Sequence, residues 1–266
     1  MNITRIDLAD CNKLGPFQPP GWDDIPNDFR AFTNSPFHDQ FKGEVGGEFV
    51  AVGAIIYHAD TAWLAKIIVH PDHRNKGYGK AITQGLIDRI DRSRFRTIYL
   101  DATELGFPVY RSLGFQEECW YVHYSNAATG GLRDADGPVR PALPSDHAAL
   151  MKLDRAAYGE DRSALLHDHL AHALIRVSGE KILGVHFPTL QQGPVVAVNA
   201  SAAEPLIRER MRTWDRAQLP ATNVNGMEVL ERMGCAEVRR SRRMFLGERR
   251  VWRPEMIFNR TSGQLG

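Results

Sequence analysis

The segment from Ile67 to Ala81, IIVHPDHRNKGYGKA, constrains the fold more than any other part of the sequence. Its β-forming residues end at His70, a basic glycine-rich loop follows from Arg74 to Gly79, and an amphipathic segment begins at Lys80. A strand, a loop of closely spaced N–H groups and a helix start form an anion site, because the first-turn N–H groups and the helix dipole both favour a phosphate. The two glycines of this loop let the main chain approach that phosphate closely.

Two common phosphate-binding loops do not fit this segment. A P-loop requires a glycine five residues before its Gly-Lys pair and a Ser or Thr after it, where this chain has Arg74 and Ala81. A dinucleotide fingerprint requires a third glycine, and Ile82 stands at that position. The pattern that remains is Arg-x-x-Gly-x-Gly after a strand, which by itself is also compatible with a glycine-rich turn that caps a helix.

Two further segments narrow the choice. Residues Tyr110 to Phe115 read Tyr-x-x-Leu-Gly-Phe, and residues Ala62 to Lys66 lead into the strand before the loop. In this order and spacing the segments resemble the GNAT superfamily of N-acetyltransferases, and the resemblance covers about residues 1 to 125. It implies a mixed α/β fold, with a central, mostly antiparallel sheet flanked by helices, in which the loop holds the pyrophosphate of acetyl-CoA.

The resemblance also implies a set of site residues. The main chain of the strand before the loop is expected to pair with the two amides of pantetheine, as an open strand edge pairs with another strand. Tyr110 is the expected general acid for the departing thiolate, and Thr103 stands where the family often has an asparagine. No metal site is expected. The expected cofactor-binding residues are Ile67, Ile68, Val69, Arg74, Asn75, Lys76, Gly77, Tyr78, Gly79, Lys80, Thr103 and Tyr110.

The expected reaction is acetyl transfer from acetyl-CoA to a primary amine of a small molecule or peptide, by direct attack. A lysine-like amine has a pKa near ~10.4, so a base must remove a proton before the amine can attack. The sequence leaves the choice of base open among Asp23, Asp24, His38, Asp101 and Glu104. An alternative function is that of a non-catalytic, regulatory module that binds acyl-CoA.

The second half of the chain looks like a loose repeat of the first. Val229 to Cys235 echoes Val109 to Phe115 at a distance of about 120 residues, which predicts a tandem GNAT protein with a degenerate second domain. The second copy has Val198 to Ala203 in place of the phosphate loop and Leu230 in place of the tyrosine, so we expect a single acetyl-CoA site. The expected divisions are a catalytic domain at 1–125, a linker at 126–140, a degenerate GNAT-like domain at 141–248 and a tail at 249–266.

The composition of the chain limits the classes of partner that it is expected to bind. The 266 residues carry a net charge of only +1 and three cysteines without metal spacing, so we expect neither nucleic acid nor membrane as a partner and a cytoplasmic location. A monomer or homodimer is expected. A dense basic region near the end of the chain is expected to be a solvated strand pair with its charges facing outward, and the alternative is that it binds an anionic partner. Its members are Arg239, Arg240, Arg242, Arg243, Arg249, Arg250 and Arg253.

Overall fold

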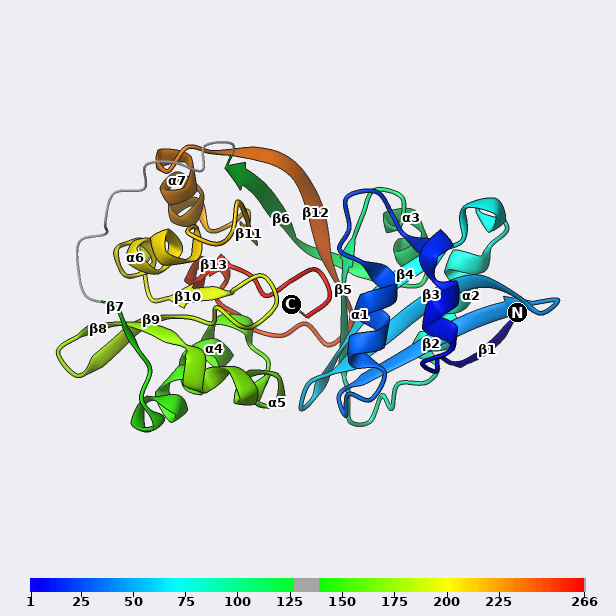
Figure 1. Cartoon of the computed structure of the whole chain (residues 1–266), viewed down its shortest axis with the longest axis horizontal. Helices are drawn as coiled ribbons and strands as arrows, with labels where there is room; N and C mark the ends of the chain where they lie inside the picture. Colours follow the sequence, from blue (N-terminus) through cyan, green and yellow to red (C-terminus); the bar gives the residue numbers. More distant parts are fainter. Residues whose placement is uncertain (127–138, 266) are drawn as a thin grey trace. The chain divides into compact units, whose positions relative to one another are not determined.

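The computed structural model describes residues 1–126 and 139–265, so most of the predicted linker lies outside the described residues. Unit 1 comprises Met1–Gln116, Met244–Glu248 and Leu265, and unit 2 comprises Glu117–Arg243 and Arg249–Gln264. Both units combine strands and helices (Figure 1). The predicted mixed α/β class, in two tandem halves with mostly antiparallel sheets, is confirmed.

Unit 1 contains the strand, loop and helix start that the sequence predicts within residues 67–81. Its helices and strands are β1 (Asn2–Arg5), η1 (Asp10–Lys13), η2 (Gly15–Phe17), α1 (Ile25–Phe32), β2 (His38–Val45), β3 (Glu48–Tyr57), β4 (Thr61–Val69), η3 (Pro71–His73), α2 (Tyr78–Ile87), β5 (Thr97–Ala102) and α3 (Phe107–Ser112). The proline-interrupted stretch before α1 forms only the short 3₁₀ helices η1 and η2. Helix α1 begins where Asp24 accepts a hydrogen bond from the Asn27 amide at 2.9 Å.

The sheet of unit 1 has the strand order β1-β2-β3-β4-β5. Every pair in this run is antiparallel except β4 with β5, which is parallel. One face packs against α1 through a cluster that contains Phe29, Val52 and Ile68. The opposite face packs against α2 and α3 through a larger cluster that includes Leu86 and Tyr110. The two helical layers therefore cover the two faces of β4, the strand that leads into the phosphate loop.

Unit 2 repeats this order of elements. Its helices and strands are β6 (Gln116–Asn126, from Glu117 onward), β7 (Val139–Pro141), η4 (Pro144–Asp146), α4 (His147–Tyr158), α5 (Ser163–Leu166), η5 (His167–His172), β8 (Leu174–Ser178), β9 (Lys181–His186), β10 (Val195–Ala197), α6 (Ala200–Arg210), β11 (Arg216–Pro220), α7 (Val224–Arg232), β12 (Cys235–Gly247, up to Arg243), η6 (Pro254–Met256) and β13 (Ile257–Asn259). One of its sheets has the order β13-β10-β9-β8-β7.

The last part of the chain differs from the expected tail. Residues 249–264 belong to unit 2 and contribute β13, which pairs with β10. The end of β12, from Met244, belongs instead to unit 1, where the Thr97 hydroxyl donates to the Glu248 carbonyl at 2.6 Å. These pairings join residues far apart in sequence, which no local pattern reveals. The boundary at residue 125 stays a prediction.

Candidate functional site

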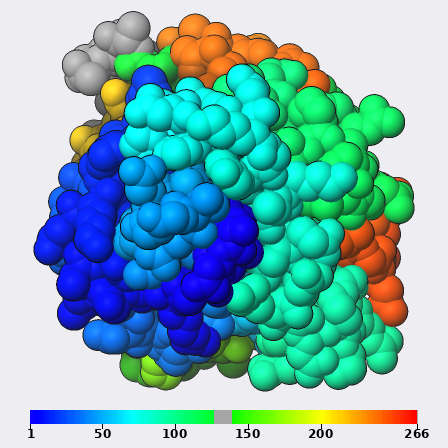
Figure 2. All heavy atoms as spheres, turned by 90° about the vertical axis from the view of Figure 1, so that its right-hand side faces the viewer, coloured from blue at the N-terminus to red at the C-terminus, as the bar shows by residue number. Residues whose placement is uncertain are grey.

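The predicted phosphate loop connects β4 to α2. Helix α2 starts after Gly77, which has φ 82°, and Asn75 also has a positive φ of 60°. The first intrahelical hydrogen bond runs from the Ala81 amide to the Gly77 carbonyl at 3.0 Å, so the amides of residues 78–80 precede it. The residues from Arg74 to Gly77 are exposed, and Figure 2 shows the cyan segment that includes this part of the chain at the surface. The loop therefore presents a row of amides at an exposed helix N-terminus.

Among the residues that the structure describes, no strand pairs with the last part of β4 on its β5 side, so this edge is open. Its pairing with β5 ends at Leu64 and Leu100. Beyond that point Gly53 of β3 lies opposite both Lys66 and Ile67, which is a β-bulge, and Lys66 has φ 51°. Residues Ile67–Val69 continue along β3, past the last residue that pairs with β5. Bulges of this kind often lie beside active sites, and here the bulge marks the start of a strand edge that can bind an extended ligand.

Tyr110 lies in α3 and packs with Phe115 in a buried apolar cluster, and Ile67 packs against the same cluster. It is 8% exposed, and a Cβ at Gly106 would lie 2.6 Å from its ring, so the glycine makes room for the tyrosine. Its hydroxyl ionises less readily than that of a free tyrosine. Burial, and then the negative charge of Asp101, raise the pKa of this hydroxyl. The tyrosine is therefore held in its protonated form.

Three further residues, Thr103, His70 and Asp24, make local hydrogen bonds to the backbone. The Thr103 hydroxyl accepts a hydrogen bond from the Gly106 amide at 3.3 Å, so it supports the turn before α3. His70 accepts a hydrogen bond from the Asp72 amide at 3.3 Å and contacts Phe17 edge-on, in keeping with a structural role. Asp24, a candidate base, caps α1.

Lys66 forms a buried polar cluster that the sequence did not reveal. Its side chain is 3% exposed, its ammonium lies 3.1 Å from the Asp28 carboxylate, and the rings of Phe29 and Phe32 flank it at 5.2 and 5.3 Å. Burial lowers the pKa of Lys66, and the carboxylate opposes that shift. Burial, and then the charge of Lys66, lower the pKa of His38 to about 3. A lysine inside an apolar strand was the available signal for this cluster.

The pKa of His38 bears on the choice of base. An imidazole whose conjugate acid has a pKa of about 3 is too weak to take a proton efficiently from an alkylammonium at neutral pH. His38 is therefore a poor candidate for the general base. Asp101 and Glu104 remain candidates, since Asp101 lies near the end of β5, the neighbour of β4, and Glu104 follows that strand.

The corresponding parts of unit 2 lack these features. Helix α6 starts at Ala200, where the Asn199 side chain accepts a hydrogen bond from the Ala202 amide at 2.9 Å. A side-chain cap thus occupies the position of the amide row of unit 1. Leu230 of α7 is fully buried and carries no hydroxyl.

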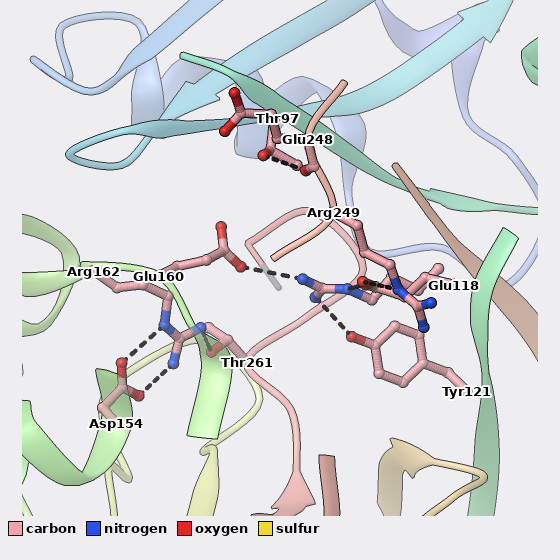
Figure 3. Close-up of polar contacts among 10 residues, drawn as sticks. Thr97, Glu118, Tyr121, Asp154, Glu160, Arg162, Glu248, Arg249 and Thr261 are labelled. Atoms are coloured by element: carbon pink, nitrogen blue, oxygen red, sulfur yellow. Dashed lines mark hydrogen bonds and ion pairs between the residues drawn. The ribbon is translucent and has the colours of Figure 1, made fainter. Parts of the chain in front are cut away.

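The basic region corrects one prediction. Arg239, Arg240, Arg249 and Arg253 are exposed as expected. Arg243, however, is fully buried and pairs with the buried carboxylates of Glu118 and Glu160. Figure 3 labels these two glutamates together with Tyr121. The Arg243 guanidinium also donates to the Tyr121 hydroxyl at 3.2 Å. A buried arginine is retained where carboxylates and further acceptors satisfy its donors, so this part of the basic region belongs to the interior of unit 2.

Neither a metal-binding cluster nor a membrane-spanning helix is found among the described residues. No group of three or more His, Cys, Asp or Glu side chains that could hold a metal ion is found among residues 1–126 and 139–265. No helix in these ranges is long and apolar enough to span a bilayer.

Comparison with known proteins identifies two matching regions. Residues 6–115 match the profile of the Acetyltransferase (GNAT) family, and residues 150–258 match that of an Acetyltransferase (GNAT) domain. Holothin acyltransferase of Pseudoalteromonas sp. (strain SANK 73390) is 24% identical over 246 residues, 85% of this chain and 81% of the relative. Ribosomal protein bS18-alanine N-acetyltransferase of Escherichia coli (strain K12) is 33% identical over 107 residues, 39% of this chain and 70% of the relative.

Solved structures show the same architecture. A Pyrococcus horikoshii protein classed as an acetyltransferase superposes with a TM-score of 0.84 at 20% identity, covering 100% of this chain and 95% of that one. A GCN5-related N-acetyltransferase from Sphaerobacter thermophilus superposes with a TM-score of 0.63 at 12% identity, covering 99% of this chain and 98% of that one. At these identities the likeness concerns the fold.

Proposed function

The chain belongs to the GNAT family of acyltransferases, which use an acyl-CoA cosubstrate, and on this premise we propose that unit 1 transfers an acetyl group from acetyl-CoA to a primary amine. The observation that carries the proposal is the continuity of the open edge of β4 with the amide row at the start of α2. The acceptor is a small molecule or a peptide. Both kinds of acceptor occur among the relatives, because one is named for holothin and the other for a ribosomal protein alanine.

The residues proposed to hold the cosubstrate form two groups. The exposed loop from Arg74 to Lys80 supplies amides and three basic side chains for the pyrophosphate, and the absence of a side chain at Gly77 keeps that approach open. The main chain of Ile67, Ile68 and Val69 offers N–H and C=O groups to the amides of the pantetheine arm. Thr103, the residue that follows β5, is proposed to extend this second group.

Tyr110 is the proposed general acid. It belongs to the apolar cluster against which Ile67 packs, and its raised pKa keeps a proton available. The hydroxyl donates this proton to the sulfur as the carbon–sulfur bond breaks, so that a neutral thiol leaves. A backbone N–H near Ile68 supports the negative charge that develops on the thioester oxygen.

The test is release of CoA thiol from acetyl-CoA across a panel of polyamines, amino acid amides, aminoglycosides and peptides. We expect acetylated product, identified by mass spectrometry, in a one-to-one ratio with released thiol. Acetyl-CoA binding without turnover of any amine would contradict the proposal and would favour a regulatory module. Turnover of an alcohol or thiol acceptor alone would contradict the choice of an amine.

A further inference from the structure

The order of elements makes β10 and β11 of unit 2 the counterparts of β4 and β5 of unit 1. The series β2-β3-β4-α2-β5-α3 in the first unit corresponds to β8-β9-β10-α6-β11-α7 in the second. In unit 1, β4 has an open edge past the end of its ladder with β5. In unit 2, the neighbours of β10 in its sheet are β9 and β13. The strand β13 of the same chain therefore lies beside β10, on the side away from β9.

The C-terminal segment bonds to both sides of this position. On one side β13 pairs antiparallel with β10, with Val195 opposite Asn259. On the other side the Arg260 amide donates to the Gln218 carbonyl of β11 at 2.8 Å. The Gln218 amide in turn donates to the Asn259 side-chain oxygen at 2.8 Å. Figure 1 shows β13, in red, beside β10 and β11. The segment therefore lies between the two counterparts of the strands that form the open site in unit 1.

Asn259 fixes the segment in this position. Its side-chain nitrogen donates to the carbonyls of Gln192 and Gly193 at 3.0 and 3.1 Å. The Asn223 side chain donates to the Ile257 carbonyl at 2.9 Å, and Arg260 donates through two of its nitrogens to the Gln218 side-chain oxygen at 2.9 and 2.7 Å. Residues 256–261 are each no more than 2% exposed. The segment is therefore buried within unit 2 and held there by hydrogen bonds.

We propose that residues 256–261 are the permanent internal occupant of the unit 2 cleft that corresponds to the acyl-CoA cleft of unit 1. An extended backbone offers N–H and C=O groups to neighbouring strands much as an extended amide ligand does. A covalently attached segment also has a high effective concentration, which a free ligand must overcome. The cleft of unit 2 therefore takes a strand of its own chain and no acyl-CoA. This inference does not depend on the acceptor or the catalytic residues of unit 1.

The first test is hydrogen exchange of the full-length chain, measured by mass spectrometry with and without saturating CoA. We expect the amides of residues 257–261 to exchange as slowly as those of buried β9, with no change on addition of CoA. Faster exchange in this segment with CoA would mean that CoA displaces it and would overturn the proposal. Exchange as fast as that of the exposed turn at Gly179 in the absence of CoA would also overturn it.

The second test uses Asn259→Ala, with Asn225→Ala as a control on the exposed surface of α7. Loss of the Asn259 contacts is expected to speed exchange of residues 257–261 about 10- to 100-fold, since a net hydrogen bond contributes roughly a factor of ten and Asn259 makes several. The control is expected to exchange like wild type. If residues 257–261 of Asn259→Ala exchanged as slowly as those of wild type, the proposed role of Asn259 in fixing the segment would be contradicted. If that variant fails to fold, the exchange of the wild-type chain with and without CoA still decides the proposal.

Discussion

Gly77→Ala adds a methyl group at the phosphate loop and is expected to change two measurable quantities, the free energy of unfolding and the affinity for acetyl-CoA. Gly77 has φ 82°, and a Cβ built there finds no atom within 4 Å. The added methyl group therefore meets no clash within the described chain, and the change in stability comes from the backbone alone. Left-handed backbone costs a residue with a Cβ about 1–2 kcal/mol. The reduced freedom of the unfolded chain offsets about 0.4–1 kcal/mol of this. We expect a net loss of about 1 kcal/mol in the free energy of unfolding.

Gly234→Ala is the matched control. Gly234 has φ 84°, and its Cβ likewise finds no atom within 4 Å, but it lies at the end of α7 in unit 2. Both variants should lose about the same stability in urea denaturation, because both place alanine in the same backbone conformation. Only Gly77→Ala should weaken acetyl-CoA binding, since its methyl group is added in the loop that is proposed to hold the pyrophosphate.

The expected loss of affinity follows from the hydrogen bonds at stake. A hydrogen bond to a charged group contributes about 1.5–3 kcal/mol, and losing one to the pyrophosphate raises the dissociation constant about 10- to 150-fold. Isothermal titration calorimetry measures this for both variants and for wild type. Wild-type affinity in Gly77→Ala would refute the assignment of the loop. Equal weakening in Gly234→Ala would show that the loss reflects general destabilisation.

Three further variants test other parts of the account. Tyr110→Phe should lower kcat about 100-fold or more with little change in acetyl-CoA affinity, because only proton donation is lost; equal kcat in steady-state assays would exclude Tyr110 as the acid. The folded pKa of His38, about 3, lies below its unfolded value of 6.5, so its neutral form contributes stability above pH 6.5 that is lost as the pH falls toward 3. Between pH 7 and 5 wild type should lose roughly 2 kcal/mol more than His38→Leu in urea denaturation, and parallel losses would contradict this. Gly247→Ala should lower the melting temperature measured by calorimetry, because φ is 99° and a Cβ would overlap the Arg96 carbonyl; an unchanged value would contradict the placement of the end of β12 in unit 1.

The loop and its neighbours could be predicted because their signals are local. The strand end, the two glycines and the start of α2 lie within fifteen or so residues, and backbone rules connect each of them to its conformation. The repeat was recognisable from the similarity between the segments around Leu113 and Met233, which lie at equivalent places in α3 and α7.

The features that escaped prediction depend on contacts between distant residues. Arg243 is buried because Glu118 and Glu160 lie beside it, and those partners are far away in the sequence. Strand alternation alone does not predict the bulge at Lys66, which depends on an extra residue opposite β3. The role of residues 257–261 could not be predicted either. It depends on the pairing of β13 with β10 and on the hydrogen bond from Arg260 to β11, and both join residues far apart in the sequence.

The most direct test of the central claim is an amide resonance titration of the isotope-labelled chain with acetyl-CoA. We expect the amide signals of Gly77 and Gly79 to shift with the same saturation curve as calorimetric binding. The amides of Ala200 to Ala203, at the start of α6 in unit 2, are predicted to stay in place. Saturable binding that leaves Gly77 and Gly79 unchanged, or that shifts Ala200 to Ala203 instead, would contradict the claim that the loop of unit 1 holds the cosubstrate.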